Sequence, residues 1–278
     1  MPELPEVETT CRGLNEMLEL HDDKKVVIER VVFTRDNIRN KIPKLKLKKL
    51  EGQQLHPIKR RAKYLLFPTE QGVLLNHLGM SGYWRELPDK QPLKTHDHCW
   101  IHFSNGKTIV YNDARRFGII DFIARDKESQ NSWLKNLGVE PLDKTFNSDY
   151  LQTLLRSRKA PIKNVIMDQK IVVGVGNIYA SEALFLAKIH PQTMANKISQ
   201  QRLGGLVNAI KKVLNNAIRA GGTTIRDFRQ AGGEQGYFVT KLKVYGRLNE
   251  LCKSCSSPIK AKIIGGRNSF WCSKCQQR

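Results

Sequence analysis

The chain has 278 residues, enough for two domains and a small module, and 40% of them are hydrophobic, which excludes a wholly disordered protein. Its 47 lysines and arginines exceed the 26 acidic residues and give a formal net charge of +21, which favours a polyanionic partner. No apolar run approaches the ~20 residues that would cross a bilayer, and the acidic, Pro-containing start is unlike a signal peptide. We therefore expect a cytoplasmic protein that binds nucleic acid and has no membrane partner.

The first 130 or so residues have the pattern of one helix followed by many short strands. Pro5 suits the first turn of a helix, and apolar residues recur at helical spacing as far as Leu18. Asn105-Gly106 between two strand-like runs is a strong hairpin signal. The predicted strands cover residues 26–33, 63–67, 73–78, 99–103, 108–111 and 117–123. This region is therefore predicted to be a β-sandwich or barrel with a leading helix.

Beyond residue 131 the spacing of apolar residues lengthens to that of helices. The predicted helices cover residues 132–137, 148–158, 161–169, 177–188 and 199–220. The Gly-rich stretch 221–236 is predicted to be a long functional loop, and short strands follow around four cysteines. The fold class is thus α+β with several domains, which we place at 1–131, 132–236 and 237–278.

Four cysteines near the end of the sequence have the spacing of a zinc ribbon. Two intervening residues separate the members of each pair, and sixteen separate the pairs, which are Cys252 with Cys255 and Cys272 with Cys275. Each pair can offer two thiolates from one tight turn, and four thiolates complete a tetrahedron around one Zn²⁺. Because four protein ligands leave no open position, such a metal is structural. Two disulfides are the alternative, which a cytoplasmic location disfavours.

The two other cysteines of the chain, and one arginine of the cysteine module, have predictions of their own. Cys11 and Cys99 stand apart from the four ligands and are predicted to be small core residues. Arg267 follows Gly265-Gly266 between the two cysteine pairs, where an arginine is well placed to grip a phosphate. A solvated arginine on an exposed turn is the alternative.

The amino terminus offers chemistry of its own. Removal of Met1 would give Pro2 a free amine, and α-amino groups titrate near pKa 7.7, against about 10.4 for lysine. At neutral pH such an amine supplies far more neutral nucleophile than a lysine does, and its attack on a sugar C1′ can form a Schiff base. Glu3 beside it could serve as general acid or base. The alternative is that Pro2 and Glu3 merely cap the first helix.

Several blocks of the sequence together resemble the formamidopyrimidine-DNA glycosylase family, whose members excise oxidised purines and nick the abasic site. The blocks follow the family's order along nearly the whole chain, at residues 2–9, 60–65, 77–82, 96–98, 112–118, 173–182 and 221–224, before the cysteine module. The resemblance implies a β-sandwich with a leading helix, a helix-two-turn-helix domain and a zinc finger. The endonuclease VIII branch typically opens Pro-Glu-Gly-Pro-Glu, so Leu4 places this chain on the oxidised-purine branch.

The resemblance also implies catalytic roles for individual residues. Pro2 would attack C1′, and Glu3 would protonate the opening deoxyribose. Glu6 would help to organise the same site. Lys63 would be a catalytic residue, and it also resembles a member of the family's set of phosphate-binding residues.

The other members of that set resemble His77, Asn177 and Arg267 of this chain. A second set resembles the family's intercalating triad, which is Met80, Arg115 and Phe117. Apolar side chains would fill the space of the extruded nucleotide, while the arginine would contact the orphaned cytosine.

We therefore expect a bifunctional glycosylase and abasic-site lyase that acts as a monomer on damaged duplex DNA at the nucleoid. It would carry one structural zinc ion and no nucleotide cofactor. The alternative is a non-catalytic zinc-ribbon DNA-binding protein, which explains the charge and the cysteines but not the ordered amine, acid and wedge residues. The Lys-rich segment 36–49 matches no motif, and its role stays open.

Overall fold

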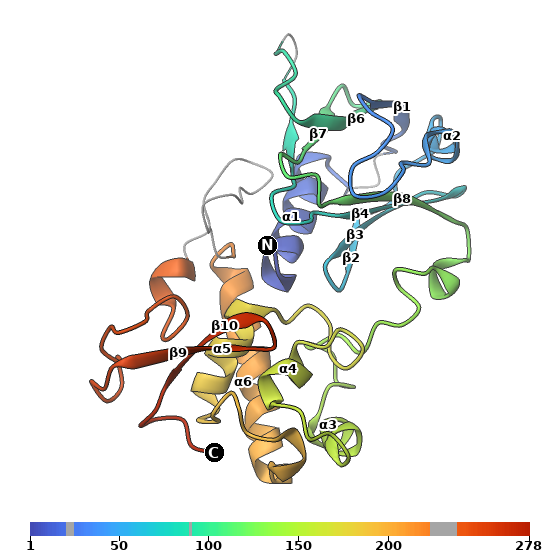
Figure 1. The fold of residues 1–278 in the computed structure, drawn as a ribbon. Helices are drawn as coiled ribbons and strands as arrows, with labels where there is room; N and C mark the ends of the chain where they lie inside the picture. Colours follow the sequence, from blue (N-terminus) through green and yellow to red (C-terminus); the bar gives the residue numbers. More distant parts are fainter. Residues whose placement is uncertain (21–24, 89–90, 223–237) are drawn as a thin grey trace. The chain divides into compact units, whose positions relative to one another are not determined.

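The computed structural model describes residues 1–20, 25–88, 91–222 and 238–278, and it divides the chain into two compact units (Figure 1). Unit 1 holds residues 1–135 and takes up the chain again at Ala220, while unit 2 holds residues 136–219 and 238–278. Among the described residues, no helix is long and apolar enough to span a membrane. The three-part division at residues 131 and 236 stays a prediction.

Unit 1 contains the predicted β-sandwich, built from two antiparallel sheets of four strands each (Figure 1). The first sheet has the order β1 (Ile28–Phe33), β6 (Asp97–Phe103), β7 (Thr108–Asn112) and β5 (Tyr83–Glu86). The second has the order β2 (Lys59–Arg61), β3 (Tyr64–Pro68), β4 (Gly72–His77) and β8 (Ile119–Ala124). Asn105-Gly106 connects β6 to β7, as the hairpin signal predicted. Strands β2 and β5 were not predicted, because three or four residues are too few to show an alternating pattern.

Buried aromatic side chains fill the core of the sandwich. The Trp84 ring packs against Phe67 and Tyr111 at centroid distances of 5.3 and 5.2 Å, and all three side chains are almost wholly buried. The indole N–H of Trp84 donates to Asn76 Oδ1 at 2.9 Å, so its one polar atom is satisfied. Cys99 is fully buried in the same core, which confirms the prediction for it.

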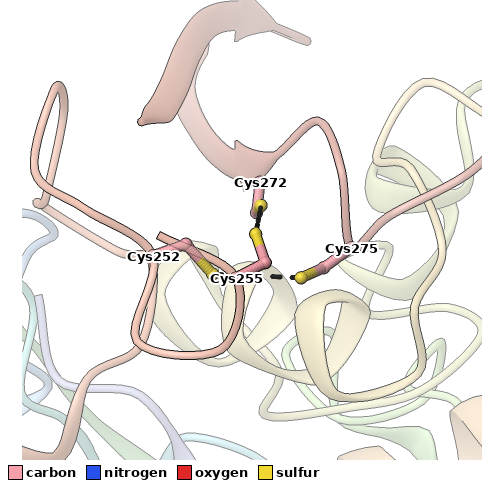
Figure 2. A group of neighbouring side chains, drawn as sticks. All are labelled: Cys252, Cys255, Cys272 and Cys275. Atoms are coloured by element: carbon pink, nitrogen blue, oxygen red, sulfur yellow. Dashed lines mark hydrogen bonds between the residues drawn. The ribbon is translucent and has the colours of Figure 1, made fainter. Parts of the chain in front are cut away.

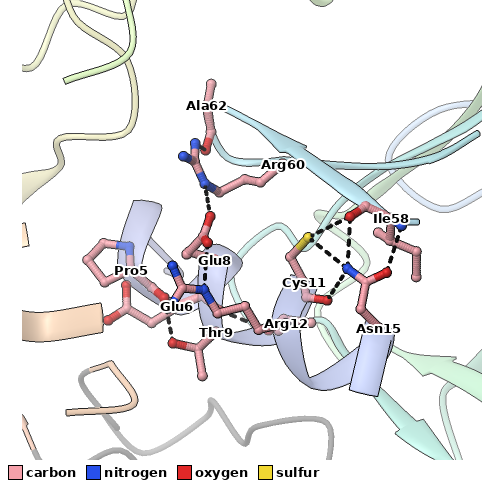
Figure 3. A network of polar contacts seen from close by, with 11 residues as sticks. Pro5, Glu6, Glu8, Thr9, Cys11, Arg12, Asn15, Ile58, Arg60 and Ala62 are labelled. Carbon is pink, nitrogen blue, oxygen red and sulfur yellow. Dashed lines mark hydrogen bonds and ion pairs between the residues drawn. The ribbon is translucent and has the colours of Figure 1, made fainter. Parts of the chain in front are cut away.

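The leading helix α1 (Leu4–Met17) is tied to the sheet by polar contacts (Figure 3). The Asn15 amide accepts from the Ile58 N–H at 2.8 Å and donates to the Ile58 carbonyl oxygen at 2.9 Å. Cys11 is buried beside this pair, as predicted, and burial raises the pKa of its thiol to about 12. Glu8 accepts from Arg60 Nε at 2.7 Å. These contacts fix the helix whose first turn carries Glu3 and Glu6.

The Lys-rich segment forms two short helices, α2 (Lys44–Leu47) and η1 (Lys48–Leu50), that the sequence did not predict. Leu47 and Leu50 anchor them as fully buried side chains, whereas the intervening lysines are exposed. The segment is therefore an ordered part of unit 1, although it lies outside the motifs discussed above.

The described residues of unit 2 form four α-helices, the short 3-10 helices η3 (Ala195–Lys197) and η4 (Phe238–Lys241), and a β-hairpin. The α-helices are α3 (Ser148–Leu155), α4 (Ile162–Ile166), α5 (Asn177–Leu186) and α6 (Gln200–Arg219), and the hairpin strands are β9 (Ile259–Ile264) and β10 (Arg267–Cys272). Helix α5 packs against both α6 and β10, so it connects the helical part to the cysteine module.

The helix predicted over residues 132–137 is wrong, because this segment is a turn. Asn131 caps a single helical turn, because its Oδ1 accepts from the Trp133 N–H and its carbonyl oxygen accepts from the Lys135 N–H, both at 2.9 Å. Gly138 then donates to the Gln169 carbonyl at 2.7 Å, and Val139 forms a parallel bridge with Val172. An extended segment thus begins before a second helical turn could form. The predicted loop 221–236 lies outside the described residues except for its first two glycines.

Candidate active site and nucleic-acid interface

The amino-terminal residues form a buried acidic cluster at the first turn of α1. Pro2 is buried, and Glu3 and Glu6 are only 3% and 2% exposed. The Glu3 N–H donates to the Glu6 carboxylate at 2.8 Å as half of a capping box, and Gly222 packs against Glu6 from the far end of unit 1. Glu3 and Glu6 therefore cap the helix, and the capping also fixes both carboxylates beside Pro2.

Lys63 and His77 lie at the end of the β3–β4 pair where β3 begins and β4 ends. Lys63 directly precedes β3, whose first residue Tyr64 pairs in register with His77 at the end of β4. Burial, together with the positive charges of Lys63 and Arg39, lowers the pKa of His77 to about 4. His77 Nδ1 accepts from the Gly79 N–H at 3.0 Å, so the ring is neutral and Nε2 carries its hydrogen. The pair thus offers an ammonium and an imidazole N–H donor.

Two neighbouring loops of unit 1 carry the three predicted wedge residues. Met80 lies on the loop between β4 and β5, where it is half-buried, and Arg115 and Phe117 lie on the loop between β7 and β8. The Arg115 guanidinium stands over the Phe117 ring at 5.0 Å from its centroid. Phe117 is 44% exposed, so this pair lies on the surface of unit 1.

In unit 2 a buried lysine connects Asn177 to the tip of the β9–β10 hairpin. Lys163, only 1% exposed, donates to Asn177 Oδ1 and, at 2.5 Å, to Ser269 Oγ. Asn177 Nδ2 in turn donates to the Asn268 carbonyl at 2.9 Å. Arg267 is exposed at the first position of β10, directly after the Gly265-Gly266 turn. The structure therefore brings Asn177 and the hairpin tip together, as the shared phosphate-binding role would require.

A second buried charge anchors the segment that leads into the cysteine module. Glu182 of α5 accepts three backbone N–H bonds at 2.8–2.9 Å, from Lys243, Val244 and Tyr245. It is 5% exposed, so its charge is compensated by these fixed donors.

The four cysteines predicted to bind zinc lie together at the end of unit 2 (Figure 2). Their sulfur atoms are all within 4.8 Å of one another, and all four are free thiols. Two of the separations are 3.9 Å, for Cys252 and Cys275, and 3.4 Å, for Cys255 and Cys272. A tetrahedral Zn²⁺ with bonds of roughly 2.3 Å sets its sulfurs about 3.8 Å apart, so the cluster fits one metal ion.

Three buried polar residues were not assigned from the sequence, namely Lys163 and the pair Ser81 and Asp113, whose side chains bond to each other at 2.7 Å. Ser81 and Asp113 lie inside the blocks that carried the family resemblance, but nothing in the sequence pairs the two. Lys163 had a clearer signal, because it stands between Ile162 and the apolar Val165-Ile166 on a short helix. A lysine at such a place is buried and needs partners.

Two family models match the chain, and together they cover most of it. The model described as the formamidopyrimidine-DNA glycosylase N-terminal domain matches residues 1–120, and that of the H2TH domain of the same enzymes matches residues 137–229. A formamidopyrimidine-DNA glycosylase of Bdellovibrio bacteriovorus is 48% identical over 278 residues, covering all of both chains.

Solved structures agree with these matches. A complex between a variant of the Lactococcus lactis Fpg protein and DNA containing Fapy-dG has a TM-score of 0.90 and 33% identity, with both chains fully covered. A complex of the Lactococcus lactis protein with abasic-site DNA has a TM-score of 0.89 and 33% identity, covering 99% of this chain and 100% of that one. The sandwich, the H2TH domain and the cysteine cluster define a DNA glycosylase fold. The chain belongs to the formamidopyrimidine-DNA glycosylase family.

Proposed function

We propose that this DNA glycosylase excises oxidised purines, such as 8-oxoguanine and formamidopyrimidines, from duplex DNA and then cleaves the abasic strand, with the Pro2 amine as nucleophile. The observation that carries the proposal is the burial of Pro2 beside Glu3 and Glu6 at the first turn of α1. The Lactococcus lactis relatives bound to Fapy-dG and abasic-site DNA support the same class of substrate.

In the proposed reaction the neutral Pro2 amine attacks C1′ as the bond to the damaged base breaks, and the base leaves with the bonding electron pair and takes up the proton that the Pro2 nitrogen loses. Glu3 donates a proton to O4′ as the sugar ring opens, which leaves an iminium between C1′ and Pro2. Loss of a C2′ proton then expels the 3′ phosphate, and a second elimination expels the 5′ phosphate. Hydrolysis of the remaining iminium releases the amine.

Residues of both units are proposed to bind DNA. Lys63, His77, Asn177 and Arg267 would hold phosphates, with the neutral His77 ring donating from Nε2 and the other groups from nitrogen atoms. Met80, Arg115 and Phe117 would fill the space left by the extruded nucleotide. The enzyme would act on DNA as a monomer and without a nucleotide cofactor.

One structural Zn²⁺ is proposed for the cysteine cluster. The sulfur separations and the free thiols fit a four-thiolate site, and the Ser254 N–H, 3.4 Å from Cys252 Sγ, could stabilise a thiolate there. When bound, the metal would hold the hairpin that carries Arg267. It would leave the chemistry to the residues of unit 1.

Trapping with borohydride tests the nucleophile. Reduction of the iminium during turnover of an 8-oxoguanine duplex should give a covalent protein–DNA adduct, with Pro2 found as its attachment site by mass spectrometry. Glu3→Gln should bind this duplex and not cleave it, whereas Glu16→Gln, an exposed change on the same helix, should act like the unchanged protein. Absence of an adduct from folded protein that binds DNA would contradict the proposal.

A further inference from the structure

The two loops that carry the proposed wedge residues run side by side between the sheets of unit 1. One joins β4 to β5, and the other joins β7 to β8, so each crosses from one sheet to the other. Cross-strand pairs flank them at both ends, with His77 opposite Ile119 and Tyr83 opposite Asn112. Strand pairing therefore places these two crossovers next to each other.

A buried carboxylate joins the two loops. Asp113 is fully buried, and its Oδ1 accepts from the Ser81 hydroxyl at 2.7 Å, while its Oδ2 accepts from the Gly118 N–H at 2.8 Å. Ser81 Oγ also accepts from the Arg115 N–H at 3.1 Å. The Ser81 and Asp113 side chains thus bond to each other across the two loops. Each also bonds to a backbone N–H near Phe117, Ser81 to that of Arg115 and Asp113 to that of Gly118.

The contact extends to the backbone and to the strand behind it. Gly79 has φ +69°, and a Cβ added there would lie 2.4 Å from the Gly118 nitrogen. A Cβ at Gly118 would lie 1.9 Å from the Tyr111 hydroxyl oxygen. His98 Nε2 donates to the Asp113 carbonyl at 2.9 Å. Because neither glycine has room for a side chain, the two loops pack closely against each other and against Tyr111 at these positions.

We propose that Ser81 and Asp113 are positioning residues that hold Met80, Arg115 and Phe117 as one preformed wedge before DNA binds. The proposal rests on the proposed function, since it assigns these side chains to the space of the extruded nucleotide. The wedge side chains take no part in the bonds that join the loops, and Arg115 and Phe117 point outward as exposed residues. A backbone ordered in advance leaves only the unstacking of the base to be driven by binding.

Comparison of two substrates tests this role. Excision of 8-oxoguanine opposite cytosine requires a stacked base to be displaced, whereas cleavage at an abasic site in the same duplex does not. Asp113→Asn should lower the single-turnover rate of excision by about 10- to 100-fold and that of abasic-site cleavage by less than about 3-fold. Ser81→Ala, which leaves the carboxylate in place, should show the same selectivity with a smaller loss.

The control is Ser104→Ala, which removes another serine hydroxyl that accepts a backbone N–H bond, that of Val27 at 2.9 Å. It should change neither rate. Thermal melting checks that each variant is folded. If Asp113→Asn does not fold, the comparison of the two substrates with Ser81→Ala tests the positioning role. Equal losses on both substrates, or no loss on either, would overturn the positioning role.

A double-mutant cycle separates positioning from general destabilisation. Met80→Ala should slow excision by about 10-fold in the unchanged protein and by less than about 3-fold in the Ser81→Ala background, because a displaced wedge has less to lose. Independent losses that multiply would contradict the inference. Failure of the unchanged protein to excise 8-oxoguanine at all would instead count against the proposed function.

Discussion

The wedge loops of unit 1 and the hairpin tip of unit 2 are both pinned by one buried charge, of opposite sign in the two places. In unit 1 the Asp113 carboxylate accepts from Ser81 and Gly118, and in unit 2 the Lys163 ammonium donates to Asn177 and Ser269. The first set lies on two neighbouring loops of the sandwich, whereas the bond from Lys163 to Ser269 joins segments 106 residues apart. The hairpin belongs to a sheet of two strands, whereas the loops connect sheets of four strands, so we expect the hairpin tip to be the more easily disrupted of the two.

Loss of the cysteine cluster is expected to have the largest effect. Cys272→Ser should abolish metal binding and unfold the hairpin, lowering affinity for lesion-containing duplex by more than about 100-fold, because the binding energy of a structural metal is folding energy. Metal analysis and equilibrium DNA binding measure both effects. Cys11→Ser, a buried change outside the cluster, should keep one metal ion and its DNA affinity. A Cys272→Ser protein with a full metal content would refute the assignment.

Removal of the buried lysine tests the hairpin tip with the metal in place. Lys163→Met replaces the lysine with an uncharged side chain of similar length. It should lower DNA affinity by about 10- to 100-fold, because Asn177 and Ser269 lose their charged hydrogen-bond donor and Arg267 is no longer held beside them. Binding titrations with the same duplex measure the loss. Lys212→Met, an exposed change on α6, provides the matched control and should leave affinity within about 2-fold. Equal affinities of the two variants would show that the buried lysine does not position the tip.

Unit 2 also contains a buried carboxylate, that of Glu182, which tests whether burial makes a charged group important for stability. Glu182→Gln should reduce the free energy of unfolding by about 1–3 kcal/mol, because an amide oxygen replaces a carboxylate that accepts three backbone N–H bonds. Denaturant unfolding gives the value. Glu250→Gln, whose side chain is 58% exposed, should cost under about 1 kcal/mol. Similar losses in the two variants would argue against the importance of burial.

The smallest effect is a pH dependence at His77 in unit 1. Its folded pKa of about 4 lies below the unfolded value of 6.5, so its contribution to stability is fully present above pH 6.5 and is lost as pH falls toward 4. Between pH 7 and pH 6 the loss should stay below about 1 kcal/mol. His77→Gln should remove this part of the slope in unfolding measurements from pH 7 to pH 6. An unchanged slope would mean that other groups produce it.

The sequence predicted the elements that have strong local signals. Six strands, the leading helix and four of five helices were found at or near their predicted places, because each has enough residues to show its period. The turn at residues 132–137 was missed because the chain leaves the helical path after one turn, where the Gly138 N–H bonds to the distant Gln169 carbonyl. The cysteine cluster was predictable because its ligands are two short-range pairs.

The contacts around the candidate site were less predictable. Pro2, Glu3 and the wedge residues came from the family resemblance, whereas the Ser81–Asp113 bond joins residues 32 positions apart. Which side chains meet across two crossovers depends on strand order, and spacing in the sequence does not contain that order. The bond from Lys163 to Ser269 spans 106 positions and is hidden for the same reason.

The bonds between the wedge loops have a consequence for protein engineering. Ser81, Asp113 and the two glycines determine the path of the backbone, while Met80, Arg115 and Phe117 are free to differ without changing it. In a saturation library, the first group of positions should not tolerate substitution. The second group, although it lies next to the first, should accept substitutions without loss of folding. Variants that accept a different base opposite the lesion should be sought by randomising only the second group, in a scaffold whose shape the first group preserves.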